Sequence, residues 1–202
     1  ASVNWYYMHF ANQYIPVTLA DGTVINASGT SDYQGVNLFV TDRPLYWLHV
    51  YSNLSFEKAD YASYSISGKD YSGLPVSYVP STLFNIGAYA KWYYSGMLFE
   101  PRVWVKYVGP QSIFDKENKL PSEQKMSAYT TLNLGLKAVV PVHLDFLHQL
   151  RVGLTLKNVT GNQYNGYEYI TSGKTFGGDS KGALLGFPGA PREVYASLSA
   201  KF

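Results

Sequence analysis

Cysteine is absent from this chain of 202 residues, and charged residues are scarce. They make up 15 % of the sequence, against about 25 % in ordinary soluble domains. No run approaches the roughly 18 consecutive apolar residues that a membrane-spanning helix needs. No G-x-S-x-G, phosphate-loop, H-E-x-x-H or EF-hand motif occurs. These absences argue against a helical membrane protein and against the common classes of soluble α/β enzyme, and the lack of cysteine is compatible with secretion into an oxidising periplasm.

Aromatic residues, in contrast, are abundant, at 16 % of the sequence with 19 tyrosines. Mean hydropathy is slightly negative. A membrane β-barrel has this composition, because its inward-facing polar residues dilute the apolar ones, while Tyr, Trp and Phe gather at the two membrane interfaces. The composition therefore favours a membrane β-barrel.

The C-terminal segment, residues 192–202 (REVYASLSAKF), alternates strictly between apolar and polar residues. Side chains on a strand alternate between its two faces, so one face of this segment is apolar and the other polar. Its length fits the roughly 9–11 residues with which a tilted strand crosses a bilayer. The segment predicts a transmembrane strand that ends on Phe202, and an ordinary strand of a soluble sandwich is the alternative.

Eight segments have the character of strands, and several alternate as cleanly as the last one. Near 127–139, for example, Leu132, Leu134 and Leu136 oppose Asn133 and Lys137. We expect no helix and no domain boundary. The predicted strands are 2–16, 31–41, 45–57, 81–92, 96–109, 127–139, 149–160 and 192–202.

The connections between these strands alternate between long and short. Residues 17–30, 58–80, 110–126 and 161–191 are long and rich in Gly, Ser, Asn, Asp and Pro, whereas the links near 42–44, 93–95 and 141–148 are short. A barrel threaded through a membrane has short periplasmic turns and long extracellular loops, and a sandwich has no reason to sort its loops in this way. The long connections are therefore predicted to be external, with the last strand descending to the periplasm.

Three motifs narrow the class of barrel. Residues 150–164 (LRVGLTLKNVTGNQY) run from an alternating strand through Asn158 to Tyr164, residues 188–192 read PGAPR, and residues 34–38 read QGVNL. They resemble the N-L-F-D-x-x-Y segment, the P-G-x-P-R lead-in to the final strand and the Q-G-V-E-L strand start of TonB-dependent outer-membrane receptors. This chain departs from the family with Val-Thr-Gly in place of Leu-Phe-Asp and with Asn37 in place of Glu.

The resemblance implies an all-β fold, a transmembrane antiparallel barrel of about 22 strands with a plugged lumen, of which this chain supplies the last eight. Residues 1–202 would be a single segment without the plug domain. The chain opens inside a strand-like stretch with neither an initiator Met nor a signal peptide, which favours a fragment.

The same resemblance implies the function. It is TonB-energised uptake of a scarce nutrient, such as a ferric siderophore-type chelate, across the bacterial outer membrane, without enzymatic chemistry or a cofactor. The implied partners are outer-membrane lipid, the TonB system acting through a plug domain, and a small-molecule ligand, with no nucleic acid.

Charged side chains predict what lines the lumen. A charge on the lipid face at mid-membrane costs about 2–4 kcal/mol, so the charges on the strands are assigned inward. Arg102, Lys106 and Lys137 are the candidate ligand contacts on this wall, for an anionic cargo such as an iron chelate; solvated wall residues without a cargo role are the alternative. The full set of inward charges is Lys91, Arg102, Lys106, Lys137, Arg151, Lys157 and Lys201 against Glu57, Glu100 and Glu193.

The predicted external loops carry many aromatic residues, of which Tyr71, Tyr78, Tyr167 and Tyr169 are candidate ligand contacts. Rigid aromatic side chains on loops suit ligand capture, and they suit a membrane-interface belt equally well.

Two further groups of residues complete the predictions. The resemblance implies that Tyr195, Leu198 and Phe202 form the signal read by the barrel-assembly machinery. His143, Asp145 and His148 make the one metal-like cluster in the sequence, and we expect no metal there because their spacing suits neither a helix nor a strand face.

Two rival architectures stay open. A complete eight-stranded barrel with a structural, adhesive or lipid-modifying role requires the first and last strands to pair with each other. A soluble β-sandwich binding module requires Leu132, Leu134, Leu154 and Leu156 to face a protein core.

Overall fold

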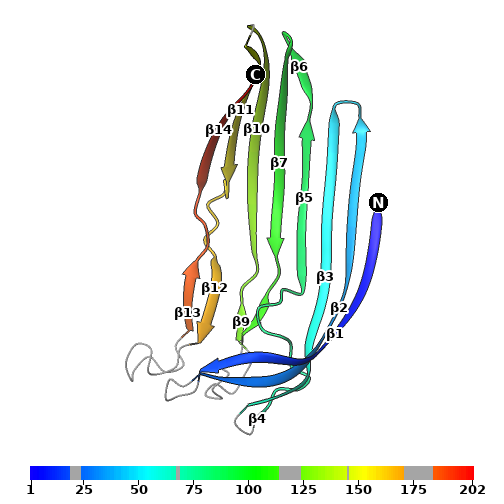
Figure 1. The fold of residues 1–202 in the computed structure, drawn as a ribbon, viewed down its shortest axis with the longest axis vertical. Helices are drawn as coiled ribbons and strands as arrows, with labels where there is room; N and C mark the ends of the chain where they lie inside the picture. Colours follow the sequence, from blue (N-terminus) through cyan, green and yellow to red (C-terminus); the bar gives the residue numbers. More distant parts are fainter. Residues whose placement is uncertain (19–23, 67–68, 114–123, 145, 171–183) are drawn as a thin grey trace.

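The computed structural model describes residues 1–18, 24–66, 69–113, 124–144, 146–170 and 184–202. One large antiparallel sheet, hereafter the wall, dominates them (Figure 1). Its strand order is β1-β2-β3-β5-β7-β10-β11-β14, so strands adjacent along the wall follow one another in the sequence. The strands are β1 (Ser2–Thr18), β2 (Val24–Leu45), β3 (Leu48–Ile66), β5 (Thr82–Ala90), β7 (Met97–Val108), β10 (Tyr129–Leu144), β11 (Leu147–Lys157) and β14 (Glu193–Lys201).

Each of these eight strands overlaps one of the eight predicted segments, although β2 and β3 are much longer than predicted, and together they confirm the all-β antiparallel fold. The fourth differs in detail, because β5 ends at Ala90 and a short strand β6 (Trp92–Tyr94) continues beside β7 after the break at Lys91. Among the described residues no helix is long and apolar enough to cross a membrane.

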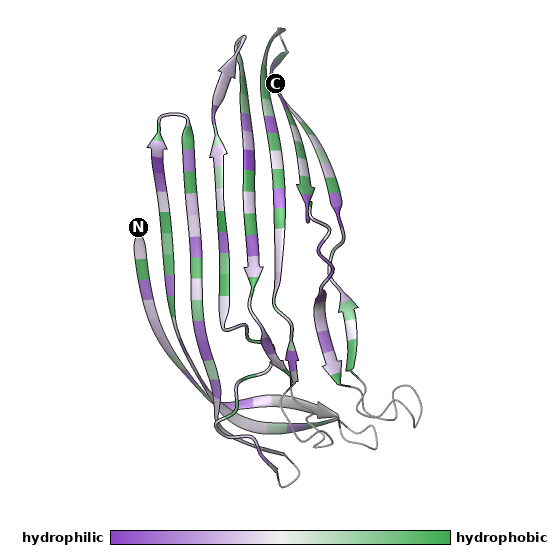
Figure 2. Cartoon of the chain, turned by 180° about the vertical axis from the view of Figure 1, so that it is seen from behind, coloured by the Kyte–Doolittle hydropathy of each residue, from purple (hydrophilic) through white to green (hydrophobic). Residues whose placement is uncertain are grey.

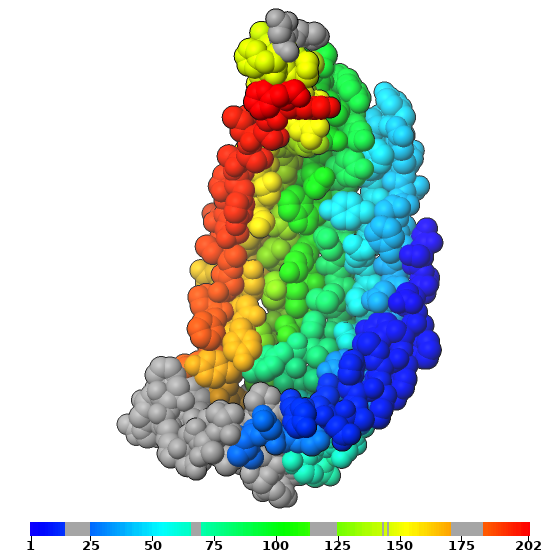
Figure 3. Space-filling model, in the orientation of Figure 1, coloured from blue at the N-terminus to red at the C-terminus, as the bar shows by residue number. Residues whose placement is uncertain are grey.

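The wall does not close on itself. In the described residues β1 pairs with β2, β14 pairs with β11, and the two edge strands do not pair with each other. Figure 3 shows the wall curved into a trough, with β1 at one rim and β14 at the other. The rival architecture of a closed eight-stranded barrel is therefore wrong, and the predicted open edge of the final strand is confirmed.

Short and long connections sort to opposite ends of the wall, as predicted (Figure 1). The first short turn lies later than the predicted 42–44, because β2 continues to a Leu45–Leu48 pair, and the third lies within the predicted 141–148, inside a Leu144–Leu147 pair. Both β2 and β10 have a register shift before the turn: Pro44 lies within the shift of β2, where a bulge accommodates a residue that lacks a backbone N–H, and Pro141 is the last paired residue before the shift of β10.

Cross-strand register places the alternating apolar residues on one face of the wall. Leu136, Leu154 and Ala196 are paired neighbours across β10, β11 and β14, and Val103 pairs with Leu134. Figure 2 shows the alternation as bands along the strands. Leu134 and Leu154 are 36 % and 43 % exposed. The sandwich architecture is therefore wrong, because this apolar face does not pack against a protein core.

The predicted external loops contain more strand than expected. The segment 17–30 is largely an extension of β1 and β2, which bend together across the loop end of the wall (Figure 1). The bend coincides with a register shift between Phe10 and Gln13, where Asn12 has a φ of 55°. Further short strands are β4 (Lys69–Asp70), β8 (Gln111–Ile113), β9 (Gln124–Met126), β12 (Asn165–Ile170) and β13 (Leu184–Pro188).

The main buried cluster among the described residues lies at this loop end. Tyr61, Tyr64 and Tyr71 are at most 5 % exposed, and their rings contact one another with centroids 4.7 Å and 5.5 Å apart. Ala59 and Val76 complete the cluster, and the backbone N–H of Val76 donates to the Ala59 carbonyl. The segment after β3 therefore folds back on β3 as a packed structure. We call this segment, together with the end of β3 from Ala59 onward and with β8, β9, β12 and β13, the external layer.

Candidate ligand-contacting wall and loops

The polar face of the wall brings the predicted basic residues together. Arg102 and Lys106 lie on one face of β7, and Lys137 joins them from β10 through an ion pair with Glu100, at 2.7 Å between Nζ and Oε2. Arg102 and Lys137 line one hollow of about 390 Å³, together with Arg151 of β11. Lys106 lines a neighbouring hollow of about 580 Å³. The sequence thus placed Arg102, Lys106 and Lys137 on one face of the wall. In the structure these three cations line two neighbouring hollows rather than one.

Several of these cations already have partners within the wall. Besides the Lys137–Glu100 pair, Nε of Arg151 donates to the Gln149 side chain at 2.8 Å. Lys157 lies 4.5 Å from the centre of the Tyr195 ring. The polar face of the wall is therefore basic, with part of its charge balanced by Glu100. The spacing of residues in the sequence did not reveal these contacts, because strand pairing and side-chain conformation decide them.

Glycine on the polar face lets aromatic side chains lie flat against the wall. A Cβ at Gly87 would stand 2.6 Å from the ring of Tyr51 and 2.8 Å from Cβ of Trp104. A larger residue at this position would force the Tyr51 ring and Cβ of Trp104 to shift, so glycine suits it best. The wall surface beside the basic hollows is consequently lined by broad aromatic faces.

The loop tyrosines fall into two groups. Tyr78 stacks on Tyr167 with centroids 4.9 Å apart, and Tyr167 and Tyr169 lie 6.1 Å apart on one side of the β12–β13 hairpin. Phe187, which pairs with Tyr167 across the hairpin, joins them and is 56 % exposed. We call these four rings the aromatic face. Tyr71 is not part of it, because its side chain is 2 % exposed in the tyrosine cluster of the external layer.

Phe187 was not among the predicted contacts, since the hairpin that pairs it with Tyr167 has no clear alternating pattern. Tyr78 carries a further signal in its backbone, with a φ of 65° that bulky residues rarely adopt. Its N–H donates to the Ser112 carbonyl. Burial, and then the hydrogen bond with Tyr167, raise the pKa of the Tyr78 hydroxyl above the ordinary tyrosine value.

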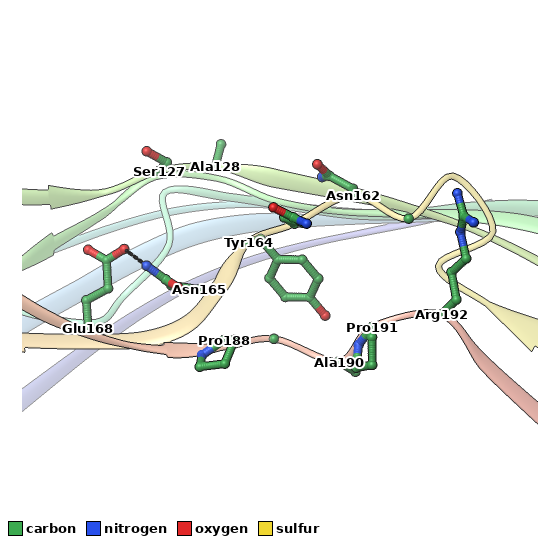
Figure 4. Close-up of a pocket in the computed structure, with 13 residues that line it drawn as sticks. Ser127, Ala128, Asn162, Tyr164, Asn165, Glu168, Pro188, Ala190, Pro191 and Arg192 are labelled. Carbon is green, nitrogen blue, oxygen red and sulfur yellow. Dashed lines mark hydrogen bonds between the residues drawn. The ribbon is translucent and has the colours of Figure 1, made fainter.

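The base of the β12–β13 hairpin borders a cavity of about 910 Å³, shown in Figure 4. Residues 161–165 form one side and residues 188–192 the other. The Tyr164 ring stacks on Tyr129 with centroids 3.9 Å apart, and the Gly189 N–H donates to the Tyr164 carbonyl at 2.7 Å. Two of the three motifs that carried the family resemblance, residues 150–164 and 188–192, thus contact each other in space.

The three residues implied as an assembly signal do not share a face. Leu198 and Phe202 are 73 % and 76 % exposed and follow the apolar alternation, whereas Tyr195 lies on the polar face beside Lys157. As for metals, the described residues contain no group of three His, Cys, Asp or Glu side chains that could hold one. The side chain of His143 and the whole of Asp145 lie outside those residues.

Comparison with known proteins agrees with this architecture. The profile of a family described as TonB dependent receptor-like, beta-barrel, matches residues 1–159. The ferric yersiniabactin uptake receptor FyuA from Yersinia pestis has a similar fold, with a TM-score of 0.68 at 19 % identity, over 100 % of this chain and 28 % of that receptor. BauA, the ferric preacinetobactin receptor from Acinetobacter baumannii, matches with a TM-score of 0.63 at 17 % identity, over 99 % of this chain and 26 % of that receptor.

No curated protein matches the sequence. The chain spans roughly a quarter of the length of the two receptors, from the shares of 28 % and 26 %. The family match covers most of the chain and agrees with the open wall, its sorted turns and its exposed apolar face. The chain therefore belongs to the TonB-dependent receptor-like β-barrels, a family of outer-membrane proteins that are not enzymes.

Proposed function

We propose that this chain is part of an outer-membrane receptor that takes up a ferric siderophore-type chelate with energy supplied through TonB. The observation that carries the proposal is the open wall of eight strands, of which the family match over residues 1–159 covers the first seven. The two similar structures are named as receptors for ferric yersiniabactin and ferric preacinetobactin, which favours an iron chelate as cargo.

In this proposal the wall is the last eight strands of a barrel of about 22, and its two edges pair with other strands of the same receptor. The plug domain, through which TonB acts, would lie elsewhere in the polypeptide. An unpaired strand edge in a bilayer leaves backbone N–H and C=O groups without partners, so the wall requires such neighbours.

Binding rather than bond chemistry would do the work. We assign cargo contacts on the wall to Arg102, Lys106 and Lys137. In the loops we assign them to Tyr78, Tyr167 and Tyr169, with Phe187 added from the structure. Tyr71 remains a sequence prediction, and its burial in the tyrosine cluster favours a packing role.

Uptake by the full-length receptor tests the proposal. The complete gene product is expressed in a bacterial strain that lacks its own ferric-chelate receptors, and accumulation of radioactive iron is measured for a panel of chelates. We expect uptake of at least one chelate, and its loss in the same strain without TonB. Uptake that persists without TonB, or no uptake from a panel covering the major chelate classes, would contradict the proposal.

The charge assignment has its own test. Replacing Arg102, Lys106 and Lys137 together by Gln is expected to lower uptake of an anionic chelate by about tenfold, the lower end of electrostatic steering effects. Lys58→Gln is the matched control, because Lys58 is paired with Asp60 on the opposite face. Unchanged transport by the triple variant would remove the assignment.

The assembly signal is proposed on the resemblance alone. Deleting Phe202 from the full-length receptor is expected to lower the amount of folded barrel in the outer membrane, while Phe146→Ala, which removes an exposed aromatic residue at the same end of the wall, leaves it unchanged. Folded barrel is measured by its altered migration on unheated gels, and an equal amount of folded protein in both variants would count against the assignment.

A further inference from the structure

The turn that follows β11 is organised by one buried amide side chain. Asn158 comes directly after Lys157, is 2 % exposed and has a φ of 49°. Asn is among the few residues other than Gly that adopt this left-handed conformation at modest cost. An asparagine here therefore permits the sharp change of direction with which the chain leaves the wall.

The polar atoms of Asn158 join three segments. Its Nδ2 donates to the carbonyl oxygens of Asn162 and Ala190, at 2.8 Å and 3.1 Å, and its Oδ1 accepts from the Asn162 N–H at 3.0 Å. Its backbone N–H donates to Oδ1 of Asn133, on the polar face of β10, at 3.0 Å. A neutral amide offers two donors and an acceptor on one group, which neither Asp nor Ala supplies. We call Asn158, Asn162, Ala190 and Asn133 the clasp.

A second set of contacts lies beside the clasp. Arg192 donates from Nη2 to the Thr160 carbonyl at 3.3 Å, and a Cβ at Gly161 would stand 2.7 Å from its Nε. A Cβ at Gly189 would overlap the ring of Tyr164. Both ends of the connection between β11 and β14 are therefore held against each other and against β10.

The clasp fixes the position of the aromatic face relative to the wall. β12 begins at Asn165, directly after Tyr164, and β13 ends at Pro188, directly before Gly189, so both hairpin strands leave from held residues. The hairpin then reaches Tyr78, which lies between β4 and β5 in the chain, and β12 also contacts β8 and β9. In the wall, β7 and β10 lie between β5 and β11. The aromatic face, which joins Tyr78 before β5 to the hairpin after β11, therefore extends across the ends of β7 and β10.

We propose that Asn158 is a positioning residue, which holds the aromatic face at the orientation in which it contacts the cargo. The proposal rests on the proposed function, because it assumes a ferric chelate that meets these rings. Asn158 does not touch the cargo itself; it acts through Tyr167 and its neighbours.

A double-mutant cycle in the full-length receptor tests this role. Asn158→Asp keeps the acceptor but removes both donors, and it is expected to weaken chelate binding at the cell surface by roughly tenfold, a common size of coupling between residues in one network. In a Tyr167→Ala background the same change should alter the dissociation constant less than about twofold. Asn26→Asp, the same chemical change at an exposed residue of β2, is the matched control and should leave affinity unchanged.

Additive effects would overturn the proposal, because they mean that Asn158 acts on binding by a route that does not include Tyr167. Folding is checked by gel migration and surface labelling. If Asn158→Asp does not reach the membrane, Asn158→Gly replaces it in the same cycle, since glycine adopts the same left-handed backbone conformation and lacks the amide side chain. Unaltered affinity in a well-folded Asn158→Asp variant also overturns it.

A readout without cargo separates this inference from the proposed function. Residues 1–202 contain no cysteine, so Tyr78→Cys with Tyr167→Cys introduces one thiol pair in this region for a short thiol cross-linker, in a receptor whose other cysteines, where it has any, are first replaced by serine. We expect efficient cross-linking in the otherwise unchanged receptor and a several-fold lower yield with Asn158→Asp. An equal yield contradicts the positioning role whatever the cargo. Failure of every chelate to bind, with the yield lowered as expected, would instead contradict the proposed function.

Discussion

The wall and the external layer place their apolar side chains in opposite ways. In the wall they point outward, and Val194, Leu198 and Val152 are between 48 % and 73 % exposed. In the external layer, apart from the β12–β13 hairpin that carries the aromatic face, they point inward, and Tyr64, Ile113 and Met126 are at most 2 % exposed. The difference follows from the solvent that each part meets. Lipid covers the outer face of the wall, whereas the loops stand in water and need a core of their own.

The comparison shows that two different kinds of interaction stabilise the two parts of this chain. The wall depends on backbone pairing and on an apolar surface matched to the bilayer, since hydrocarbon supplies no hydrogen bonds. The external layer depends on buried side chains, like a small soluble domain. A substitution should therefore have consequences that depend on the part in which it lies, and three predictions test this.

The largest effect is expected from the core of the external layer. Tyr71→Ala removes a ring that is 2 % exposed and should destabilise this layer locally by about 3–5 kcal/mol, as for other buried aromatic residues. Hydrogen exchange should increase over residues 59–76 and stay unchanged in β10 and β11. Tyr14→Ala, at a ring that is 82 % exposed, is the control and should change neither. Loss of protection in the wall as well would mean that the two parts are not independent.

A smaller effect is expected from a charge on the lipid face. Leu154→Arg places a cation on the exposed apolar face of β11 and should destabilise the full-length barrel by about 2–4 kcal/mol if it lies near the bilayer midplane. Thr155→Arg, one residue further along on the polar face, should be tolerated. Denaturant unfolding in lipid vesicles measures both. Equal destabilisation by the two variants would contradict the assignment of the faces.

The smallest effect, of opposite sign, is expected at Tyr64. Its hydroxyl is buried and makes no hydrogen bond within the described residues, and burial raises its pKa. Tyr64→Phe removes this unsatisfied group and should stabilise the external layer by about 1 kcal/mol. Tyr61→Phe is the matched control, because the Tyr61 hydroxyl has a hydrogen bond with the Ser77 backbone, and it should destabilise slightly. Hydrogen exchange over the same residues measures both, and a loss of stability in Tyr64→Phe would show that its hydroxyl is satisfied.

The sequence predicted the wall far better than the external layer. Alternation between apolar and polar residues is a local property with a period of two, so it identified all eight wall strands and assigned faces to Val103, Leu134 and Leu154. Bilayer thickness and the need to keep charge from lipid impose this pattern on each strand separately. Strand ends were less well predicted, because β2 and β10 continue in pairing past Pro44 and Pro141 through a register shift.

By itself, then, the sequence determined the class of fold, the sorting of its turns, the family and the inward face that carries Arg102, Lys106 and Lys137. Only the tertiary structure decided that Lys137 pairs with Glu100, that Tyr71 is buried apart from Tyr78, that Phe187 joins Tyr167, and that Asn158 joins Asn133 to Ala190. These contacts link residues that are far apart in the chain. Most of these residues lie in loops, where the sequence has no regular alternation of apolar and polar residues. Their partners are fixed by packing in three dimensions, which no local period records.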